Sequence, residues 1–264
     1  MRTLFWNTHK NTNINAILGE LIIENNISVA VLAEYEANLD ELIQILADQG
    51  KNLQPYLTLG CDRIKIIGSI DGVVAGAHTD YMSMQIIDGD KILCCIHLTS
   101  QIYSRNEQFR NIVIQRIITD IEEAESRYGT DKTIVVGDFN INPYDTGCTG
   151  VQYFNSVPVY SEAKKKTRTV AGQAFSMFYN PMWNLLGDAN KPCGTYYYSG
   201  SDTYWNIYDQ VIIRPVLRDS FIDDSLKILT ETSSRYLLNR NGHPNPQISD
   251  HLPIVFEIKE ENNG

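Results

Sequence analysis

The chain has 264 residues, of which 43% are hydrophobic and 20% are charged, and its formal net charge is −10. These values are typical of a globular protein with a sizeable core, and no apolar run approaches the roughly 20 residues that a membrane-spanning helix needs. The charge argues against a broad basic surface that grips duplex phosphates, although it leaves room for a local basic groove.

The N-terminal residues and the cysteines bear on the cellular compartment. The start of the chain lacks the apolar stretch of a secretory signal, so we expect a cytoplasmic protein. There are five cysteines, an odd number without a C-x-x-C pair, which predicts neither a disulfide framework nor a zinc site. We therefore expect reduced and mostly buried thiols.

The first 50 residues predict alternating strands and helices. Thr3–Asn7 is a short apolar run, and apolar residues at helical spacing follow over Ile14–Glu24. Val29–Ala33 is a continuous apolar run that ends at Glu34, as a buried strand does, and Leu39–Leu46 predicts a second helix. Because a helix separates the two strands, we expect them to pair in parallel.

The middle of the chain is richer in β-structure. Short runs separated by Gly and Asp predict an antiparallel meander. They are Ile64–Ile70, Val73–His78, Tyr81–Ile87 and Lys91–Leu98. Glu107–Tyr128 then predicts a long helix, and Thr133–Val136 a buried strand that delivers Asp138 at its end. The apolar stripe of the helix should consist of Phe109, Ile112, Val113, Ile117 and Ile121.

Residues 141–194 are the least regular part, and we expect a helical and loop excursion there. Strands should resume after it. They are predicted at Thr195–Tyr198, Tyr208–Ile213, Phe221–Leu229 and Pro253–Ile258. Because neither an internal repeat nor a low-complexity linker is present, we expect a single domain over residues 1–264.

Polar side chains follow the predicted strands at the points where these end. They are Asn7, Glu34, His97, Asp138 with Asn140, and, near the C-terminus, Asp250 and His251. Oxygen ligands in small number suit Mg²⁺, with Mn²⁺ as a possible substitute, and these ions keep several waters for a substrate phosphate. Signatures of serine hydrolases, zincins and P-loop proteins are absent, so a divalent-metal phosphoryl site is predicted.

Six short motifs resemble, in order and spacing, those of the endonuclease/exonuclease/phosphatase (deoxyribonuclease-I-like) superfamily. They are Trp6–Asn7, Glu34 at its strand end, Ile96–Leu98, Gly137–Asn140, Tyr208–Val211 and Ser249–Ile254. The resemblance extends over nearly the whole chain, which makes it far more specific than any single motif. It implies an α/β fold, a four-layer sandwich of two mixed β-sheets flanked by helices.

The resemblance also implies a metal site and a water-activating group. Asn7 and Glu34 would hold the metal, with Asp250 as a further ligand or a group bonded through water. Asp138 would orient or deprotonate the attacking water, and Asn140 would fix that water or a phosphate oxygen. Taken alone, Asp138 and Asn140 are also typical of a simple turn, and Glu34 of a solvated strand end.

The same resemblance assigns roles to two histidines. His251, held in one tautomer by Asp209, would donate a hydrogen bond to the phosphate as negative charge grows on it, and His97 would flank the phosphate from the other side. A single histidine beside an apolar strand is often structural, and this is the alternative to the catalytic role that we favour for His97. Two residues after Asn7, where several nucleases of the superfamily carry Asp, this chain has His9, which leaves a second metal ligand there in doubt.

Basic and aromatic residues near the motifs are candidates for substrate binding. Arg105 and Arg110 follow His97 and are candidates for binding phosphate, although salt bridges on a helix surface are the commoner role of such residues. Tyr198 and Trp205 belong to an aromatic cluster before Asp209 and are candidates for stacking on a base or sugar. The basic run at 164–168 is either a solvated stretch or a local phosphate-binding element.

The leading hypothesis is a metal-dependent nuclease that cuts DNA or RNA by in-line attack of water, with a nucleic acid or nucleotide as its partner. A phosphatase or phosphodiesterase acting on a small phosphorylated metabolite, cyclic nucleotide or lipid headgroup is the alternative, which the charge of −10 favours. A catalytically silent binding module is disfavoured because every acid and histidine of the motif set is present. The sequence does not identify protein partners.

Overall fold

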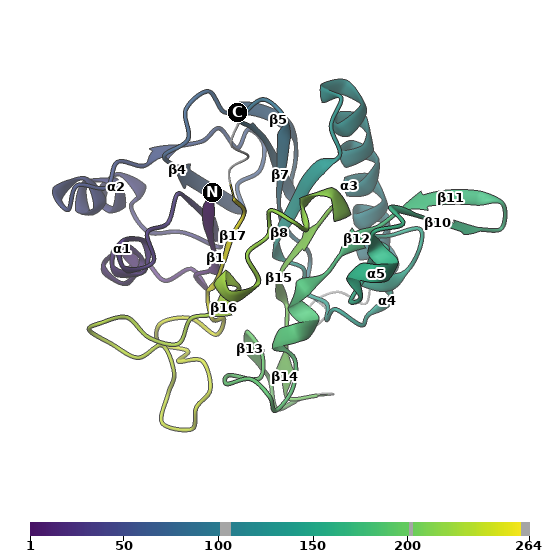
Figure 1. Cartoon of the computed structure of the whole chain (residues 1–264). Coiled ribbons are helices and arrows are strands. Elements are labelled where there is room, and N and C mark those ends of the chain that lie inside the picture. Colours follow the sequence, from purple (N-terminus) through teal and green to yellow (C-terminus); the bar gives the residue numbers. More distant parts are fainter. Residues whose placement is uncertain (101–106, 201–202, 260–264) are drawn as a thin grey trace.

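The computed structural model describes residues 1–100, 107–200 and 203–259. Two mixed β-sheets lie face to face, and the longer helices cover their outer surfaces (Figure 1). Across the six-stranded sheet the order is β16 (Lys227–Ile228), β17 (Ile254–Glu257), β1 (Arg2–Asn7), β2 (Val29–Ala33), β4 (Ile64–Gly68) and β3 (Gln54–Pro55). Across the seven-stranded sheet it is β5 (Val74–Thr79), β6 (Met82–Ile87), β7 (Lys91–His97), β8 (Lys132–Asp138), β15 (Asp209–Ile213), β12 (Phe178–Tyr179) and β9 (Ser156–Val157).

Three apolar clusters separate the layers. Helices α1 (Asn15–Glu24) and α2 (Leu39–Asp48) pack on the six-stranded sheet, and α3 (Glu107–Tyr128) packs on the seven-stranded sheet. Side chains alternate between clusters along the strands, so that Phe5 lies between the two sheets whereas Trp6 faces α1 and α2. The layers are thus helix, sheet, sheet and helix, which confirms the predicted four-layer sandwich.

Several predicted elements are present at nearly the predicted positions. The strands β1 and β2 pair in parallel, with Asn7 opposite Ala33. Strands β5, β6 and β7 form the antiparallel meander, but β4 does not belong to it. Instead β4 pairs antiparallel with β2 in the other sheet, where Ile64 lies opposite Ala33. A run of apolar residues indicates a strand but carries no information about its partner, which explains the error.

The buried stripe of α3 differs from the predicted one. Ile114, Ile117 and Ile121 are buried, whereas Phe109 is 40% exposed and Ile112 is 62% exposed. The buried face runs through Arg110, whose long side chain was read as polar surface although its aliphatic part can pack like an apolar residue.

Two other predictions were wrong in detail. Only Lys227–Ile228 of the predicted strand Phe221–Leu229 is a strand, and Asp223–Ser225 forms a 3-10 turn, η3. Thr195–Tyr198 reduces to β13 (Tyr196–Tyr197), which pairs with β14 (Trp205–Asn206) outside both large sheets. A second 3-10 turn, η2, spans Pro215–Leu217.

Residues 141–194 contain short strands as well as the expected helices and loops. The helical pieces are α4 (Thr146–Thr149), α5 (Tyr160–Ala163) and the 3-10 helix η1 (Pro181–Leu185). Strands β9 and β12 extend the seven-stranded sheet, while β10 (Thr167–Val170) and β11 (Gln173–Ser176) form a hairpin that projects from the body of the protein (Figure 1).

Two general expectations can be compared with the structure. All five cysteines are free thiols, and four of them are buried. Among the helices of residues 1–100, 107–200 and 203–259, none is both long enough and apolar enough to cross a membrane.

Candidate active site

The ends of five strands meet on the two facing sheets. In the seven-stranded sheet, His97 at the end of β7 lies opposite Asp138 at the end of β8, and Asp138 lies opposite Asp209 at the start of β15. In the six-stranded sheet, the parallel pairing of β1 with β2 places Asn7 beside Glu34, the residue that follows Ala33. The register of the strands therefore aligns these polar residues at one end of the sandwich.

The segment before β17 joins this end from the C-terminal side. The hydroxyl of Ser249 donates to the carbonyl oxygen of Asn7 at 2.7 Å, and the indole Nε1 of Trp6 donates to the carbonyl oxygen of His251 at 2.9 Å. These two contacts hold Asp250 and His251 against the end of β1. All eight residues that were predicted to be catalytic or metal-binding are thus at the same end of the molecule, and seven of them line one cavity of about 820 Å³; the eighth, Asp209, lies behind His251.

Asp138 is the central buried acid. Its Oδ2 accepts a hydrogen bond from Asn7 Nδ2 at 2.9 Å, and its Oδ1 accepts one from the backbone N–H of Asn140 at 2.8 Å. Burial raises the pKa of Asp138 to about 7, and the negative charge of Asp209 adds to this increase, although His251 opposes it. A carboxyl group with this pKa can accept a proton near neutral pH.

His251 and Asp209 form a second buried pair. The imidazole Nδ1 lies 2.8 Å from Asp209 Oδ2, while Nε2 lies 3.9 Å from Asp138 Oδ2. Burial lowers the pKa of His251, but the charges of Asp209 and Asp138 outweigh that effect and raise it to about 10. His251 is therefore an imidazolium at neutral pH, with Nδ1–H donating to Asp209 and Nε2 on the side of Asp138.

His97 has the opposite electrostatic character. Burial, followed by the positive charge of Arg63, lowers its pKa to about 3, so that the ring is neutral. Its Nε2 lies 3.6 Å from Glu34 Oε1 and 3.7 Å from Asp138 Oδ2, and its Nδ1 is buried without a hydrogen-bond partner among the described residues. A neutral imidazole with a free nitrogen can position a polar group, but it cannot supply positive charge.

The donors around Glu34 fit a hard divalent cation. The carboxylate of Glu34 is 28% exposed in the cavity, and within the described parts of the chain it makes no hydrogen bond that would neutralise it. Asn7 and Asp250 line the same cavity with a carboxamide and a carboxylate. His9, the residue that left a second metal ligand in doubt, lies beside these donors, with its Nδ1 3.1 Å from Asp250 Oδ1.

Asp138, Asp209 and His251 also offer three ligand atoms within 4.8 Å of one another. We do not assign the cation to them, because Asp209 and the Nδ1 of His251 already satisfy each other by a hydrogen bond of 2.8 Å. On the other side of the cavity, the carboxylate of Glu34 accepts no hydrogen bond among the described residues, while Asn7 Oδ1 accepts one from the N–H of His9 at 3.0 Å and keeps a second lone pair.

The backbone around the cavity is unusual. His9, Lys10, Glu34 and Asn140 have φ values of 49°, 56°, 48° and 50°, which is the left-handed region that non-glycine residues rarely adopt. Each such residue costs about 1–3 kcal/mol and persists only where the surroundings enforce it. Here they do, since the N–H of Lys10 donates to the carbonyl oxygen of Glu34 at 3.0 Å. Such strain is typical of functional sites.

The predicted substrate-binding residues that the structure describes do not line the cavity. Arg110 is buried on α3 and does not line the cavity among the described residues. Trp205 is partly buried, and its ring packs against Tyr197 and His243 with centroid distances of 5.4 and 5.8 Å. Tyr198 is 38% exposed but lies outside the described cavity lining, and Arg105 lies outside the described residues. Stacking by Trp205 is therefore structural in this conformation.

Lys10, Arg63, Tyr196 and Tyr208 also line the cavity and were not among the predicted site residues, although Tyr196 belongs to the predicted aromatic cluster and Tyr208 to a motif. Tyr196 stacks on Tyr208 at 5.2 Å and lies 4.8 Å from the ring of His251, so that these rings form an aromatic wall beside the imidazole. Lys10 and Arg63 line the cavity near Glu34. The only available signal was their position next to motif residues or at the start of a predicted strand.

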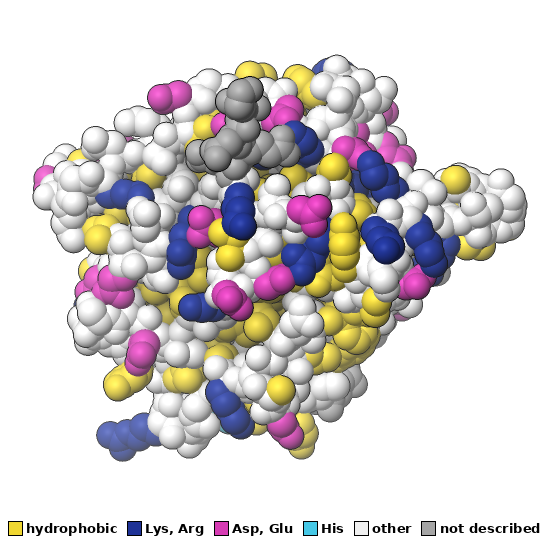
Figure 2. Space-filling model, in the orientation of Figure 1, with side chains coloured by type: hydrophobic (Ala, Val, Ile, Leu, Met, Phe, Trp, Pro, Cys, Tyr) yellow, Lys and Arg dark blue, Asp and Glu magenta, His cyan; other side chains and the backbone are white. Residues whose placement is uncertain are grey.

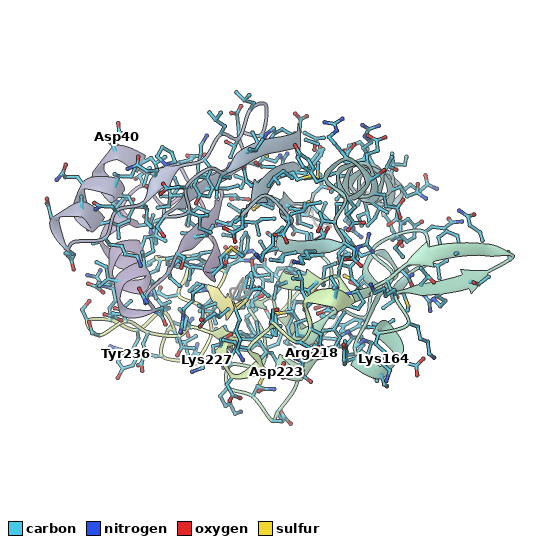
Figure 3. The ribbon with its side chains drawn as sticks, turned by 45° about the horizontal axis from the view of Figure 1, so that its top comes forward. Asp40, Lys164, Arg218, Asp223, Lys227 and Tyr236 are labelled. Atoms are coloured by element: carbon cyan, nitrogen blue, oxygen red, sulfur yellow. The ribbon has the colours of Figure 1, made fainter. Side chains whose placement is uncertain are left out.

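Two of the four basic side chains in the run at 164–168 pair with acids. Lys166 pairs with Asp131 at 2.9 Å, Lys165 pairs with Glu162, and Arg168 donates to Asn155 at 2.5 Å. Lys164 lies at the surface beside α5 (Figure 3). These contacts favour the solvated interpretation over a phosphate-binding element.

The comparisons with known proteins rest on structure alone, since no family model and no curated protein sequence matches the chain. The 3′ phosphatase NExo from Neisseria, bound to a product DNA hairpin, matches with a TM-score of 0.61 at 14% identity and covers 98% of this chain and 100% of its own. An AP endonuclease from Archaeoglobus fulgidus matches with a TM-score of 0.60 at 13% identity, and the match covers 98% of this chain and 100% of the endonuclease. The catalytic domain of human Nocturnin with a bound sulfate matches with a TM-score of 0.56 at 12% identity, and the match covers 98% of this chain and 94% of the domain.

These matches cover both chains almost completely, as the order of the motifs implied. The two facing mixed sheets with helices outside are the architecture that these structures share with the chain. The chain therefore has the deoxyribonuclease-I-like fold of the endonuclease/exonuclease/phosphatase superfamily.

Proposed function

We propose that this chain is a divalent-metal-dependent hydrolase of phosphate esters and that its substrate is a nucleic acid or nucleotide. The observation that carries the proposal is the arrangement of Asp138 and His251. A buried carboxyl group with a pKa near 7 lies 3.9 Å from an imidazolium that Asp209 holds in place. A base and a cationic hydrogen-bond donor at this distance can flank a water molecule and the phosphate that it attacks.

The roles of the side chains follow from their contacts. Asp138 accepts the proton of the attacking water while Asn7 and Asn140 hold its two oxygens in place. His251 donates a hydrogen bond from Nε2 to a phosphate oxygen, and the charge that grows there in the transition state strengthens this bond. Asp209 is a positioning residue, because it touches only the far nitrogen of the ring.

A divalent cation held by Glu34, Asn7 and Asp250 would neutralise phosphate charge and act as a Lewis acid. Mg²⁺ is our first choice, since the three side chains offer oxygen donors only, and Mn²⁺ shares this preference.

The aromatic wall supports a nucleotide substrate. The rings of Tyr196 and Tyr208 lie next to His251, where a base or sugar attached to the phosphate would stack. On the face shown in Figure 2, Lys and Arg are interspersed with Asp and Glu, and no continuous basic surface is visible. The net negative charge of the whole chain favours a single strand or a short substrate over a long duplex. The net charge of −10 keeps a small phosphorylated metabolite as the second candidate.

A cleavage panel tests the proposal. Wild-type protein with Mg²⁺ or Mn²⁺ is incubated with single-stranded DNA, duplex DNA, RNA, cyclic dinucleotides and inositol phosphates. We expect cleavage of at least one nucleic acid and loss of all activity in EDTA. Turnover of the small phosphates alone would replace the nucleic-acid assignment by the second candidate, and no turnover of any compound would reject the enzyme assignment.

The Asp209–His251 pair predicts a change in the pH dependence of kcat. Hydrolysis needs ionised Asp138 and protonated His251, so the wild-type rate should rise as the pH passes through about 7 and fall above about 10. Asp209→Asn removes the charge that raises the pKa of His251, so the alkaline limb should move to lower pH. We expect kcat at pH 8 to fall about 100-fold.

The matched control for this variant is Asp223→Asn. Asp223 also pairs with a cation, Arg218, at 2.5 Å, but lies at the surface (Figure 3). Its profile should match that of the wild type. An alkaline limb that stays in place in Asp209→Asn would show that Asp209 does not set the charge of His251.

Removal of the Glu34 carboxylate should weaken metal binding. In Glu34→Gln we expect the affinity for Mn²⁺, measured by the electron paramagnetic resonance signal of the free ion, to fall about 10- to 100-fold. Glu36→Gln is the control, since Glu36 is exposed and its nearest cation, Lys10, is 4.0 Å away. Equal affinities of the two variants would contradict the assignment of Glu34 as a ligand.

A further inference from the structure

Arg63 is held at the same end of the sandwich as the active site. It precedes β4, and because β4 runs antiparallel to β2, Arg63 lies across from Glu34. The N–H of Glu34 donates to the carbonyl oxygen of Arg63 at 3.2 Å, which fixes the backbone. The side chain lines the 820 Å³ cavity.

The guanidinium group of Arg63 stacks on an aromatic ring. Its Cζ lies 4.9 Å from the ring centroid of Tyr81, and the side chain makes no ion pair or hydrogen bond with the described residues. Stacking on a ring orients the planar group while its five N–H donors stay available. An unpaired arginine inside a cavity of an acidic protein is arranged for an anionic ligand.

The position of Tyr81 places this cation away from the reaction centre. Tyr81 directly precedes β6, and its carbonyl oxygen accepts a hydrogen bond from the N–H of His97 at 3.0 Å. Strand β6 is separated from β8, which carries Asp138, by β7. Two strand intervals amount to about 10 Å. The order of strands in the six-stranded sheet leads to the same conclusion. There, β1 and β2 lie between β4, which follows Arg63, and β17, which follows His251.

We propose that Arg63 binds a second phosphate group of the substrate, next along the strand from the phosphate that is hydrolysed. This inference rests on the proposed function. The cavity then selects substrates with at least two linked phosphates, such as an oligonucleotide, over substrates with an isolated phosphodiester. Arg63 is a specificity-determining residue in this scheme and leaves the reacting atoms to Asp138 and His251.

Two substrates separate this role from a contact with the scissile phosphate. They are a single-stranded DNA octamer and bis(4-nitrophenyl) phosphate, which has one phosphate. In Arg63→Met we expect kcat/KM for the octamer to fall about 10- to 100-fold, as for a lost hydrogen bond to a charged group, and kcat/KM for the single-phosphate compound to stay within about twofold. Arg63→Lys should recover part of the loss. Lys65→Met, which removes the same charge from β4 outside the described cavity lining, should resemble the wild type.

Binding provides a readout that does not depend on turnover. In EDTA, fluorescence polarisation of the labelled octamer should show about tenfold weaker binding to Arg63→Met, and the slope of log affinity against log salt should fall by about 0.7. Equal losses on both substrates, or unchanged octamer binding, would overturn the second phosphate site. If the wild type cleaves neither these two compounds nor any compound of the cleavage panel, the proposed function fails, while the polarisation assay still decides the role of Arg63.

Discussion

Asp138→Ala should lower kcat by roughly 10³-fold, the largest effect on activity that we expect from any single residue of the cavity. The variant removes the only carboxylate that is held by both Asn7 and Asn140 beside the imidazolium of His251. The protein should remain folded, because burial raises the pKa of Asp138 to about 7 and its ionisation in the folded state therefore costs free energy.

The measurement is steady-state hydrolysis of the best nucleic acid from the cleavage panel, together with a thermal melting curve. Asp131→Ala is the control, since Asp131 is exposed and pairs with Lys166. If Asp138→Ala keeps more than about a tenth of the wild-type kcat, Asp138 does not activate the water.

Gly137→Ala should cause the largest loss of stability. A Cβ at this position would lie 1.9 Å from the carbonyl oxygen of Ile96 and 2.9 Å from its Cγ1. Because Ile96 belongs to β7, which pairs in parallel with β8, the methyl group would force the two central strands apart. We expect the free energy of unfolding to fall by about 3 kcal/mol or more, measured by urea denaturation.

Gly172→Ala is the matched control. Gly172 lies at the tip of the β10–β11 hairpin with φ at 81°, and nothing lies within 4 Å of its added Cβ. The substitution should cost only about 1 kcal/mol, from the backbone conformation alone. Similar losses in the two variants would mean that the contact with Ile96 is not what requires glycine. In Gly137→Ala, the separation of β7 from β8 would also move His97 away from Asp138. Gly137 is therefore needed for the site as well as for the fold.

The strand ends were predictable from the sequence because burial and chemistry change sharply there. Val29–Ala33 is wholly buried, and Glu34 follows it directly in the cavity. Asp138, His97 and Asn7 are likewise the last residues of their strands. For such residues, an apolar run followed directly by one polar residue is enough to predict a side chain of the site at the end of a strand.

Residues that depend on strand pairing could not be predicted in this way. Arg63 precedes an apolar run that looks like part of the meander, and only the antiparallel pairing of β4 with β2 brings it to Glu34. Trp205 and Tyr196 come from one aromatic cluster, yet Trp205 packs on Tyr197 while Tyr196 reaches the cavity. The orientation of a two-residue strand leaves too short a pattern to show which ring is exposed.

Hydrolysis of a single-stranded oligonucleotide in water labelled with oxygen-18 tests the central claim most directly. With Mg²⁺ or Mn²⁺ present, attack of water at phosphorus predicts one labelled oxygen in the product phosphate group, detected by mass spectrometry, and Asp138→Ala should form almost none of this product. Absence of product in the wild type, or product without the label, would contradict a phosphoester hydrolase that uses a water held by Asp138.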